Sequence, residues 1–438
     1  MKKVLLLIAL CCTTFNYAQE ADSTDVAYKK RVLEATEIDF LMSYYKQDGV
    51  HSAVSGGRGT EELTDVTPTI VVNMPLNDDD ILTVDAGISA YSSASSGNIN
   101  PFDSDTPSPW QASSGASASD VLSTLVLNYS HSTDDRKTIW NAHVSGAVEY
   151  DYSSIGFGGS LTRLFMGRNT ELTVAANVYL DTWKPIYPKE LNDFVENGNT
   201  LNGGIFNDFT ITGNTDYNPE LFTFHNKKNR NSYALSLSFS QILSTKAQLA
   251  LFLDLVQQDG LLSTPYQRIY FADKTDFFIN EFQLADDVER LPDNRFKFPL
   301  GARLNYYANQ WLVVRTYYRY YVDDWGVSAH TANIELPVKL TDKFTIFPMY
   351  RYYKQQKSKY FAPYEQHYSS ELFYTSDYDL STFYAHQYGF GFVYTDIFTS
   401  AKIWKIGLKN IDIRYNHYSR SDGLDADIVS FGTKFVIQ

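Results

Sequence analysis

The sequence predicts an all-β protein: a transmembrane, antiparallel, up-and-down β-barrel of about 16 strands. Three observations support this prediction, namely an N-terminal export signal, long segments in which apolar and polar side chains alternate, and connections that are alternately short and long. Membrane-crossing β-strands need roughly 9–11 residues because they are tilted, whereas strands of soluble sheets average about 5–6 residues. Long alternating segments therefore favour a barrel over a soluble sandwich.

The chain begins with MKKVLLLIALCCTTFNYAQE, in which two lysines precede an apolar run and a small residue, Ala18. This order is typical of a secretory signal peptide and predicts cleavage after residue 18. A lipoprotein signal is the weaker interpretation, because bulky Leu10 precedes Cys11. Cys11 and Cys12 are the only cysteines, so the mature chain holds no disulfide. Residues 19–35 are then a short periplasmic segment, too short for a plug domain.

Strict alternation is clearest in the segment 247–257, where Ala247 and the leucines at 249, 251, 253 and 255 share one face. The same period of two residues, which is diagnostic of a strand with one buried face, recurs along the chain. It predicts strands at 36–46, 65–74, 81–92, 119–130, 138–150, 154–165, 171–183, 231–243, 247–257, 294–306, 311–323, 327–339, 343–355, 382–396, 403–418 and 425–438.

Every second connection between these strands is a tight polar turn, such as PLNDDD or HSTDDRK, and the others are often long, as at 47–64, 184–230 and 258–293. Short turns on one side and long loops on the other are typical of outer-membrane barrels, whose longer loops are extracellular. The alternation slips within 397–418, which predicts a bulge or a longer periplasmic segment and leaves fourteen strands as the alternative. The barrel domain is then 36–438, with both of its ends in the periplasm.

Composition agrees with a membrane barrel. The 33 tyrosines include Tyr318, Tyr320, Tyr350 and Tyr352 near the predicted loop end of their strands, where amphipathic rings form a girdle at the lipid headgroups. The net charge of −14 disfavours a nucleic-acid partner, because phosphate binding requires a basic surface. We therefore expect a cell outer membrane localisation, with outer-membrane lipid as a partner and periplasmic or surface proteins as further candidates.

The first long loop contains the stretch QDGVHSAVSGGRGTEEL, residues 47–63. No helix follows its glycines, so it does not predict a phosphate-binding loop, and adjacent His51 and Ser52 cannot orient each other as a nucleophile and its base. The glycines instead predict positive φ angles or close backbone approach in a loop folded against the barrel. The candidate loop motif is His51, Ser52, Gly56, Gly57, Gly59, Thr60 and Glu61.

Other polar stretches give weaker signals. The sequence NDDD at 77–80 and the Asp/Asn-rich loop 193–220 offer oxygen ligands for calcium, but their spacing is not that of an EF-hand, so solvated loops are the favoured interpretation. His143, His330 and His386 fall on strands as isolated residues without metal-ligand spacing. We predict no catalytic residue, no metal site and no cofactor.

Three stretches together resemble a known family: HSAVSGGRGTEEL (51–63), AYSSASSGNI (90–99) and SGASASD (114–120). They are similar to a Bacteroidetes-type outer-membrane family catalogued as domain of unknown function thirty-five-seventy, over nearly the whole mature chain. Arg58 departs from the aliphatic residue that we expect there. The resemblance implies a barrel of unproven activity, with a link to an extracytoplasmic redox or maturation system, and carries over no catalytic residue.

Charged residues on the predicted lumen face form a second pattern, with acids on early strands and bases on later ones. The candidate lumen charges are Asp85, Glu149, Asp254, Arg303, Arg315, Arg319 and Arg351. In a barrel of about 16 strands the third and eleventh strands lie opposite each other, so Asp85 would face Arg315 and Arg319. Opposed walls of this kind suit a charge-selective channel, whereas paired charges would seal a filled lumen.

Three functions follow from these observations. The favoured one is a passive or charge-selective pore whose lumen the loops constrict. The alternative is a non-conducting scaffold that anchors or exports partners of a redox or maturation system. The second alternative is an outer-membrane enzyme, which would need a convergent catalytic set of residues that the sequence does not offer.

Overall fold

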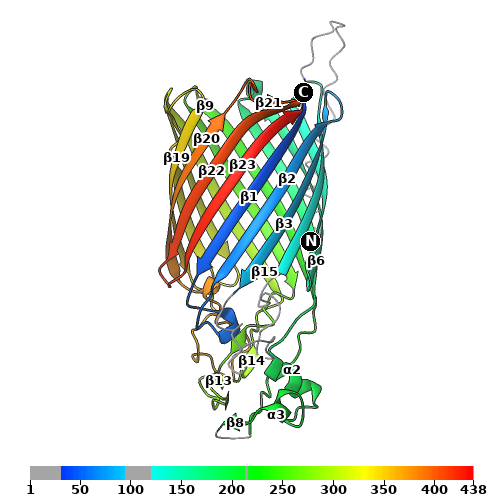
Figure 1. Ribbon diagram of the computed structural model, residues 1–438, viewed down its shortest axis with the longest axis vertical. Helices are drawn as coiled ribbons and strands as arrows, with labels where there is room; N and C mark the ends of the chain where they lie inside the picture. The colour runs from blue at the N-terminus through cyan, green and yellow to red at the C-terminus, as the bar shows by residue number, and fades with distance from the viewer. Residues whose placement is uncertain (1–30, 94–119, 213–215, 438) are drawn as a thin grey trace. The chain divides into compact units, whose positions relative to one another are not determined.

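The computed structural model describes residues 31–93, 120–212 and 216–437, and residues 32–438 make up one folded unit. An antiparallel sheet of 18 strands forms this unit, and two of them, β18 (Val338–Lys339) and β21 (Lys402–Ile403), are two-residue pieces, so 16 strands form the barrel wall (Figure 1). The first strand pairs with the last, from Thr36 beside Ile437 to Asp48 beside Asp425, which closes the barrel. Sixteen strands are thus confirmed and fourteen excluded.

Each strand of the wall pairs with the next one along the chain. The strands are β1 (Thr36–Asp48), β2 (Leu63–Pro75), β3 (Asp80–Ser93), β4 (Asp120–Ser132), β5 (Thr138–Val148), β6 (Tyr152–Phe165), β7 (Thr170–Trp183), β9 (Asn229–Ser244), β10 (Ala247–Gly260), β15 (Asn294–Asn309), β16 (Leu312–Asp323), β17 (Ser328–Glu335), β19 (Phe344–Gln356), β20 (Phe383–Thr395), β22 (Ile406–Arg420) and β23 (Asp425–Ile437).

The pairing register separates an apolar outer face from a polar inner one. Successive pairings align Val72, Val84, Leu127, Val144, Phe157 and Val178 across β2 to β7. Side chains one position away on each strand point to the opposite face, so polar residues line the lumen. No helix among residues 31–93, 120–212 and 216–437 is long and apolar enough to cross a membrane.

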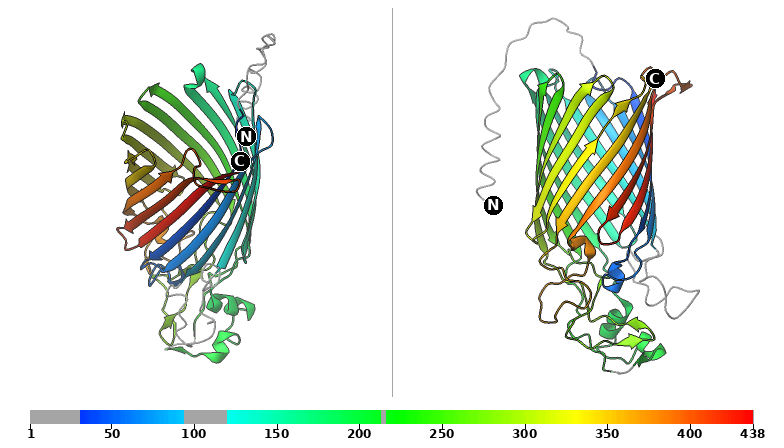
Figure 2. Two further views of the ribbon diagram at one scale, coloured as in Figure 1. Left: turned by 45° about the horizontal axis from the view of Figure 1, so that its top comes forward. Right: turned by 90° about the vertical axis from the view of Figure 1, so that its left-hand side faces the viewer.

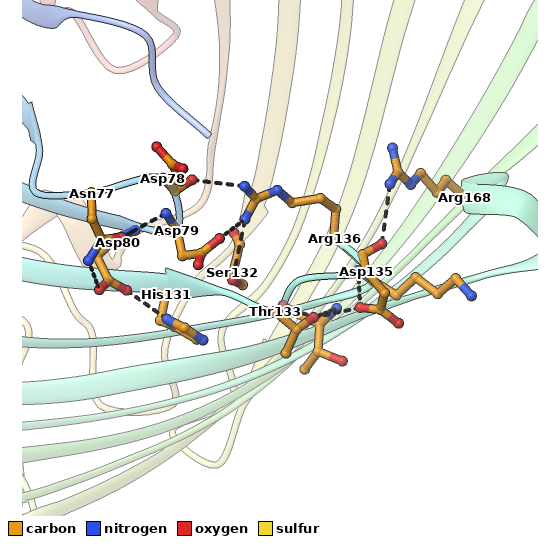
Figure 3. Close-up of polar contacts among 12 residues, drawn as sticks. Asn77, Asp78, Asp79, Asp80, His131, Ser132, Thr133, Asp135, Arg136 and Arg168 are labelled. Carbon is orange, nitrogen blue, oxygen red and sulfur yellow. Dashed lines mark hydrogen bonds and ion pairs between the residues drawn. The ribbon is translucent and has the colours of Figure 1, made fainter. Parts of the chain in front are cut away.

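Short turns gather at one end of the barrel, which we call the turn end (Figure 1). The NDDD stretch lies there, and Figure 3 shows that its polar groups bond to one another and to the next turn. Asn77 Oδ1 accepts hydrogen bonds from the backbone N–H groups of Asp79 and Asp80, at 2.8 and 2.9 Å. Arg136 donates to Asp79 Oδ1 at 2.5 Å, so the acids have protein partners.

The irregularity predicted within 397–418 is confirmed. The pairing of β22 with β23 shifts register between Leu408 and Asn410, and the segment before it forms a small hairpin of β21 with the start of β22. The predicted strand 327–339 is likewise interrupted, since β17 ends at Glu335 and β18 begins at Val338.

The opposite end, the loop end, carries ordered structure that the sequence did not predict. We call the cap the segments 49–62, 184–212, 216–228, 261–293 and 357–382, which gather beyond this end of the barrel (Figure 2). The cap contains η2 (Ala53–Ser55), α2 (Lys189–Glu196), α3 (Ile205–Asp208), β8 (Ile211–Thr212), β11 (Arg268–Ile269), β12 (Phe278–Ile279), β13 (Phe282–Gln283), β14 (Asp287–Val288) and η5 (Tyr378–Leu380).

A hydrophobic core holds the cap together. Its buried members come from loops far apart in sequence: Leu191, Ile205, Ile211, Tyr217, Phe222, Tyr270, Ile279, Leu284, Ala285 and Val288. The prediction that 193–220 is a solvated loop is therefore wrong. Asp193 is buried, and its side chain accepts a hydrogen bond from Ile205 N at 2.9 Å and pairs with Lys189. These contacts join α2 to α3.

Candidate functional site

The candidate loop motif forms a compact turn inside the cap. His51 and Gly59 are bridged, Ser52 and Val54 are buried, and η2 fills the space between them. Gly56, Gly57 and Gly59 have φ angles of 69°, 85° and 85°, a region that favours glycine because other residues clash there. This is the backbone shape that the glycine content predicted.

Two of these glycines also touch other cap loops. A Cβ atom on Gly56 would lie 2.7 Å from the Tyr270 ring, and one on Gly57 would lie 2.7 Å from the carbonyl oxygen of Ser376. Ordinary van der Waals contact begins near 3.4 Å, so neither position has room for a side chain. The motif is thus wedged between the loop 261–293 and the loop 357–382.

The side chains of the motif fix the same packing. The His51 ring stacks on Tyr378 with centroids 3.4 Å apart, and its Nδ1 lies 2.9 Å from the carbonyl oxygen of Gly57. Arg58 lies over the Tyr364 ring at 3.2 Å from its centroid and donates to Gln283 at 3.3 Å. Arg58 therefore joins the motif to both neighbouring loops.

A fully buried ion pair connects the motif to α2. Arg268 donates to both carboxylate oxygens of Glu190, at 2.7 and 3.0 Å, and its third donor reaches the carbonyl oxygen of Val54 at 3.0 Å. Burial opposes the charge of Arg268, but the adjacent Glu190 carboxylate keeps the arginine pKa above its ordinary value. The bidentate hydrogen bonds within the pair offset the free-energy cost of removing both charges from water.

The cap is also bonded to the barrel wall. Arg420 on β22 donates to Asp379 Oδ1 at 2.6 Å and to the carbonyl oxygen of Tyr378 at 2.9 Å. Gln355 on β19 donates to the carbonyl oxygens of Asp379 and Ser381, at 2.9 and 2.8 Å. Since His51 stacks on Tyr378, a continuous line of contacts runs from the wall through the motif to α2.

Several cap carboxyls are buried without a full complement of cations. Burial raises the pKa of Glu289 to about 8, and the pKa of Asp286, Asp377 and Glu61 to about 7 each. Glu289 accepts hydrogen bonds from Thr264 N, at 2.5 Å, and from the Thr375 hydroxyl. The protonated acid is the form that burial favours, so the folding of the cap is coupled to pH.

The pairing register places six of the seven candidate lumen charges on the inner face of the wall, and the seventh, Glu149, lies in the turn between β5 and β6. Arg315 does not have to reach across the lumen for a partner, because Glu335 on the neighbouring strand accepts from it at 2.8 Å. Glu335 also accepts from Arg414 at 3.1 Å. Arg303 lies 5.4 Å from the Phe252 ring centroid, and Glu149 accepts from the Tyr91 hydroxyl. The pairing of Asp85 with the basic wall stays a prediction.

The middle of the lumen is not filled by side chains. Leu41 and Tyr179 point inward by their register, yet 45% and 38% of their surfaces are exposed. In a packed core such residues would be buried. The inner wall is therefore accessible to solvent at these two positions.

The sequence did not reveal the residues that hold the cap, which are Glu190, Arg268, Gln355 and Arg420. It also did not reveal Glu335, the acid on the inner wall of the barrel. A signal for α2 existed, since Leu191, Phe194 and Val195 repeat at helical spacing within KELNDFVE. Within the described ranges no group of three or more metal-ligating side chains comes together. His330 and His386 instead contact the hydroxyls of Tyr318 and Tyr350, at 2.7 and 2.8 Å.

Comparison with known proteins gives one family and several distant folds. A family profile described as "Protein of unknown function (DUF3570)" matches residues 7–423. No curated protein sequence matches the chain. The solved structures that it resembles include a bacterial polysaccharide outer-membrane secretin, at 9% identity and a TM-score of 0.43, over 92% of this chain and 99% of that one. They also include a BenF-like porin from Pseudomonas fluorescens, at 8% identity and a TM-score of 0.38, over 92% of this chain and 98% of that one.

Proposed function

We propose a function for this chain, which belongs to the DUF3570 family of proteins of unknown function: it forms a passive, charge-selective outer-membrane pore with a mouth constricted by the cap. The observation that carries the proposal is the exposure of inward-facing Leu41 and Tyr179 in the middle of a closed barrel. A lumen that holds solvent along its wall can conduct ions, whereas a side-chain-filled barrel cannot.

The inner-wall charges support selectivity. Arg315, Glu335 and Arg414 form a connected group on the lumen face, in which two guanidinium groups share one carboxylate. Rings of charged side chains at a constriction set the ion preference of pores. Asp412 also accepts from Arg414 at 3.1 Å, so the two arginines and two acids leave no net charge at this level of the wall, and the sign of the preference is left to measurement.

Orientation follows from the same proposal. A cleaved signal peptide delivers the chain to the outer membrane, with the turn end in the periplasm and the cap outside the cell. A single cysteine replacing exposed Asn207 in the cap should react with an impermeant maleimide on intact cells, and one replacing exposed Met166 at the turn end should not. The reverse labelling would show that the cap faces the periplasm.

The proposal is tested by recording current across a planar bilayer that contains the refolded full-length protein. We expect discrete conductance steps, with a reversal potential in a salt gradient that departs from zero and so reports a charge preference. Before recording, heat-modifiable mobility in a detergent gel shows that the barrel is folded. A folded barrel that gives no steps contradicts the pore.

A second candidate function is a non-conducting scaffold, and the contacts that anchor the cap to Arg420 and Gln355 favour it. A rigid folded cap offers a docking face for a surface partner, including components of a redox or maturation system. Co-purification of a partner with a non-conducting barrel would support this function. We propose no catalytic role.

A further inference from the structure

A cavity of about 390 Å³ lies where the inner wall between β3 and β10 meets the cap. This volume is within the range of roughly 300–1,000 Å³ that small-molecule sites occupy. Charged groups of both signs line it, namely Glu149, Asp151, Asp181 and Arg230. Its other walls are largely aromatic, formed by Tyr91, Tyr152, Trp183 and, from the cap, Tyr266.

Two buried polar atoms in this cavity have no hydrogen-bond partner among the described residues: Asp181 Oδ1 and Trp183 Nε1. Both belong to β7, two positions apart, and so project to the same side of the strand. One is an acceptor and the other is a donor. Leaving such atoms unpaired is costly, so their presence together points to a ligand that can satisfy both.

The chemistry of the two atoms selects the ligand. A protonated amine could donate to Asp181, but it has no lone pair to accept from the indole N–H of Trp183. A carboxylate or phosphate could accept from Trp183, but three acids against one guanidinium surround it with like charge. A hydroxyl group both donates and accepts and carries no charge, so it suits the acid-rich lining as well as both orphan atoms.

The aromatic walls indicate what kind of molecule carries the hydroxyl groups. The Tyr152 and Trp183 rings meet edge to face, with centroids 6.2 Å apart and planes at 89°, so they present faces in two directions. Flat apolar faces pack against the C–H surface of a ring-shaped solute, while its hydroxyls reach the polar groups at the rim. We propose that this cavity is a binding site for a neutral saccharide at the mouth of the lumen. This inference rests on the pore proposed above and names the class of solute that the pore would admit.

Calorimetric titration of the full-length protein in detergent micelles tests the inference, with maltose, cellobiose and lactose as probes and with lysine and glutamate for comparison. We expect saturable binding of at least one disaccharide and none of the amino acids. Trp183→Phe keeps an aromatic ring and removes the N–H, and Asp181→Leu keeps the approximate size of the side chain and removes the acceptor oxygens. Each should weaken binding about tenfold, the factor that one hydrogen bond typically contributes. Trp311→Phe, in a turn at the opposite end, is the matched control and should bind as the wild type does.

Absence of disaccharide binding, tighter binding of an amino acid, or disaccharide binding that neither cavity variant weakens would each overturn the site. Heat-modifiable mobility confirms that every variant is folded. Conductance is recorded separately, so the two proposals can fail independently. A conducting barrel that binds no disaccharide refutes only the saccharide site, whereas a binding barrel that does not conduct refutes only the pore.

Discussion

The two ends of this barrel are stabilised in different ways. At the turn end the backbone of each turn is held by local contacts, as where Asn77 accepts from Asp79 and Asp80 two and three positions later, and single bonds such as that of Arg136 to Asp79 join neighbouring turns. At the loop end they are long-range, since Glu190 and Arg268 are 78 positions apart and Arg268 and Val54 are 214 apart. Local turns form independently, whereas a network of buried long-range contacts is lost together. Single substitutions should therefore have larger effects in the cap than at the turns.

The largest effect is expected from the buried ion pair. Glu190→Gln leaves the Arg268 guanidinium buried without a counter-charge, which typically costs about 3–5 kcal/mol. Hydrogen exchange of cap amides should report this loss, with little change in the strands. Asp293→Asn breaks the exposed pair with Lys227 and should cost less than about 1 kcal/mol, so it serves as the control. Equal effects of the two changes would show that the buried pair of Glu190 and Arg268 stabilises the cap no more than an exposed ion pair does.

Gly57 comes next. Gly57→Ala places a Cβ atom 2.7 Å from the Ser376 carbonyl oxygen at a φ of 85°, so it combines backbone strain with a clash. Gly167→Ala, at the turn end, has a φ of 66° and nothing within 4 Å, so it isolates the strain, which is about 1–2 kcal/mol. The clash should add roughly 1–3 kcal/mol for Gly57 alone. Equal losses of unfolding free energy in the two variants would argue against close packing of the motif.

The two ends should also respond to pH in opposite directions. Burial raises the pKa of Glu289 to about 8, above its ordinary value near 4.5, so the folded cap binds a proton that the unfolded cap releases. The stability from this group is complete below about pH 4.5 and is lost as the pH rises through 8. At the turn end, a hydrogen bond from the Thr133 hydroxyl lowers the pKa of Asp135, so that contribution is lost on acidification instead.

Hydrogen exchange of the cap, corrected for the intrinsic effect of pH, should therefore accelerate between pH 6 and pH 8.5. Glu289→Gln keeps a neutral side chain at every pH and should remove the part of this dependence between pH 7 and pH 8, while Asp286, Asp377 and Glu61, each with a pKa raised to about 7, keep their contributions at lower pH. A cap that becomes more protected as the pH rises would show that the sign of this coupling is wrong.

The smallest effect is expected from His51. His51→Ala removes the stack on Tyr378 and the contact with the Gly57 carbonyl oxygen, together worth about 1 kcal/mol. His51→Phe restores the ring and should recover part of the loss. A hydrolytic or redox activity that His51→Ala abolishes in a folded barrel would instead favour the enzyme interpretation.

The same contrast explains how far sequence reasoning could reach. The wall was predictable, because alternation such as that of 247–257 reports which face meets lipid, and the strand count follows from the turns. The positive φ of Gly56 and Gly57 was predictable from glycine content, but their neighbours Tyr270 and Ser376 were not, because pairwise contacts between distant loops leave no periodic signal. For the same reason the loop 193–220 appeared to be solvated, although Asp193 and Ile205 are buried in the cap.

We propose that the cap constricts a barrel that holds solvent, and that the candidate loop motif joins the other loops of the cap to one another. The most direct measurement is the single-channel conductance of a variant lacking residues 52–60, recorded beside the wild type and beside Asp293→Asn, which leaves the motif intact. We predict larger conductance steps for the deletion and wild-type steps for Asp293→Asn, because the deletion removes the Val54 carbonyl that Arg268 bonds and the packing of Gly57 against Ser376, and so loosens the cap. A folded deletion variant that stays at the current baseline would contradict it, since the barrel would then be sealed elsewhere.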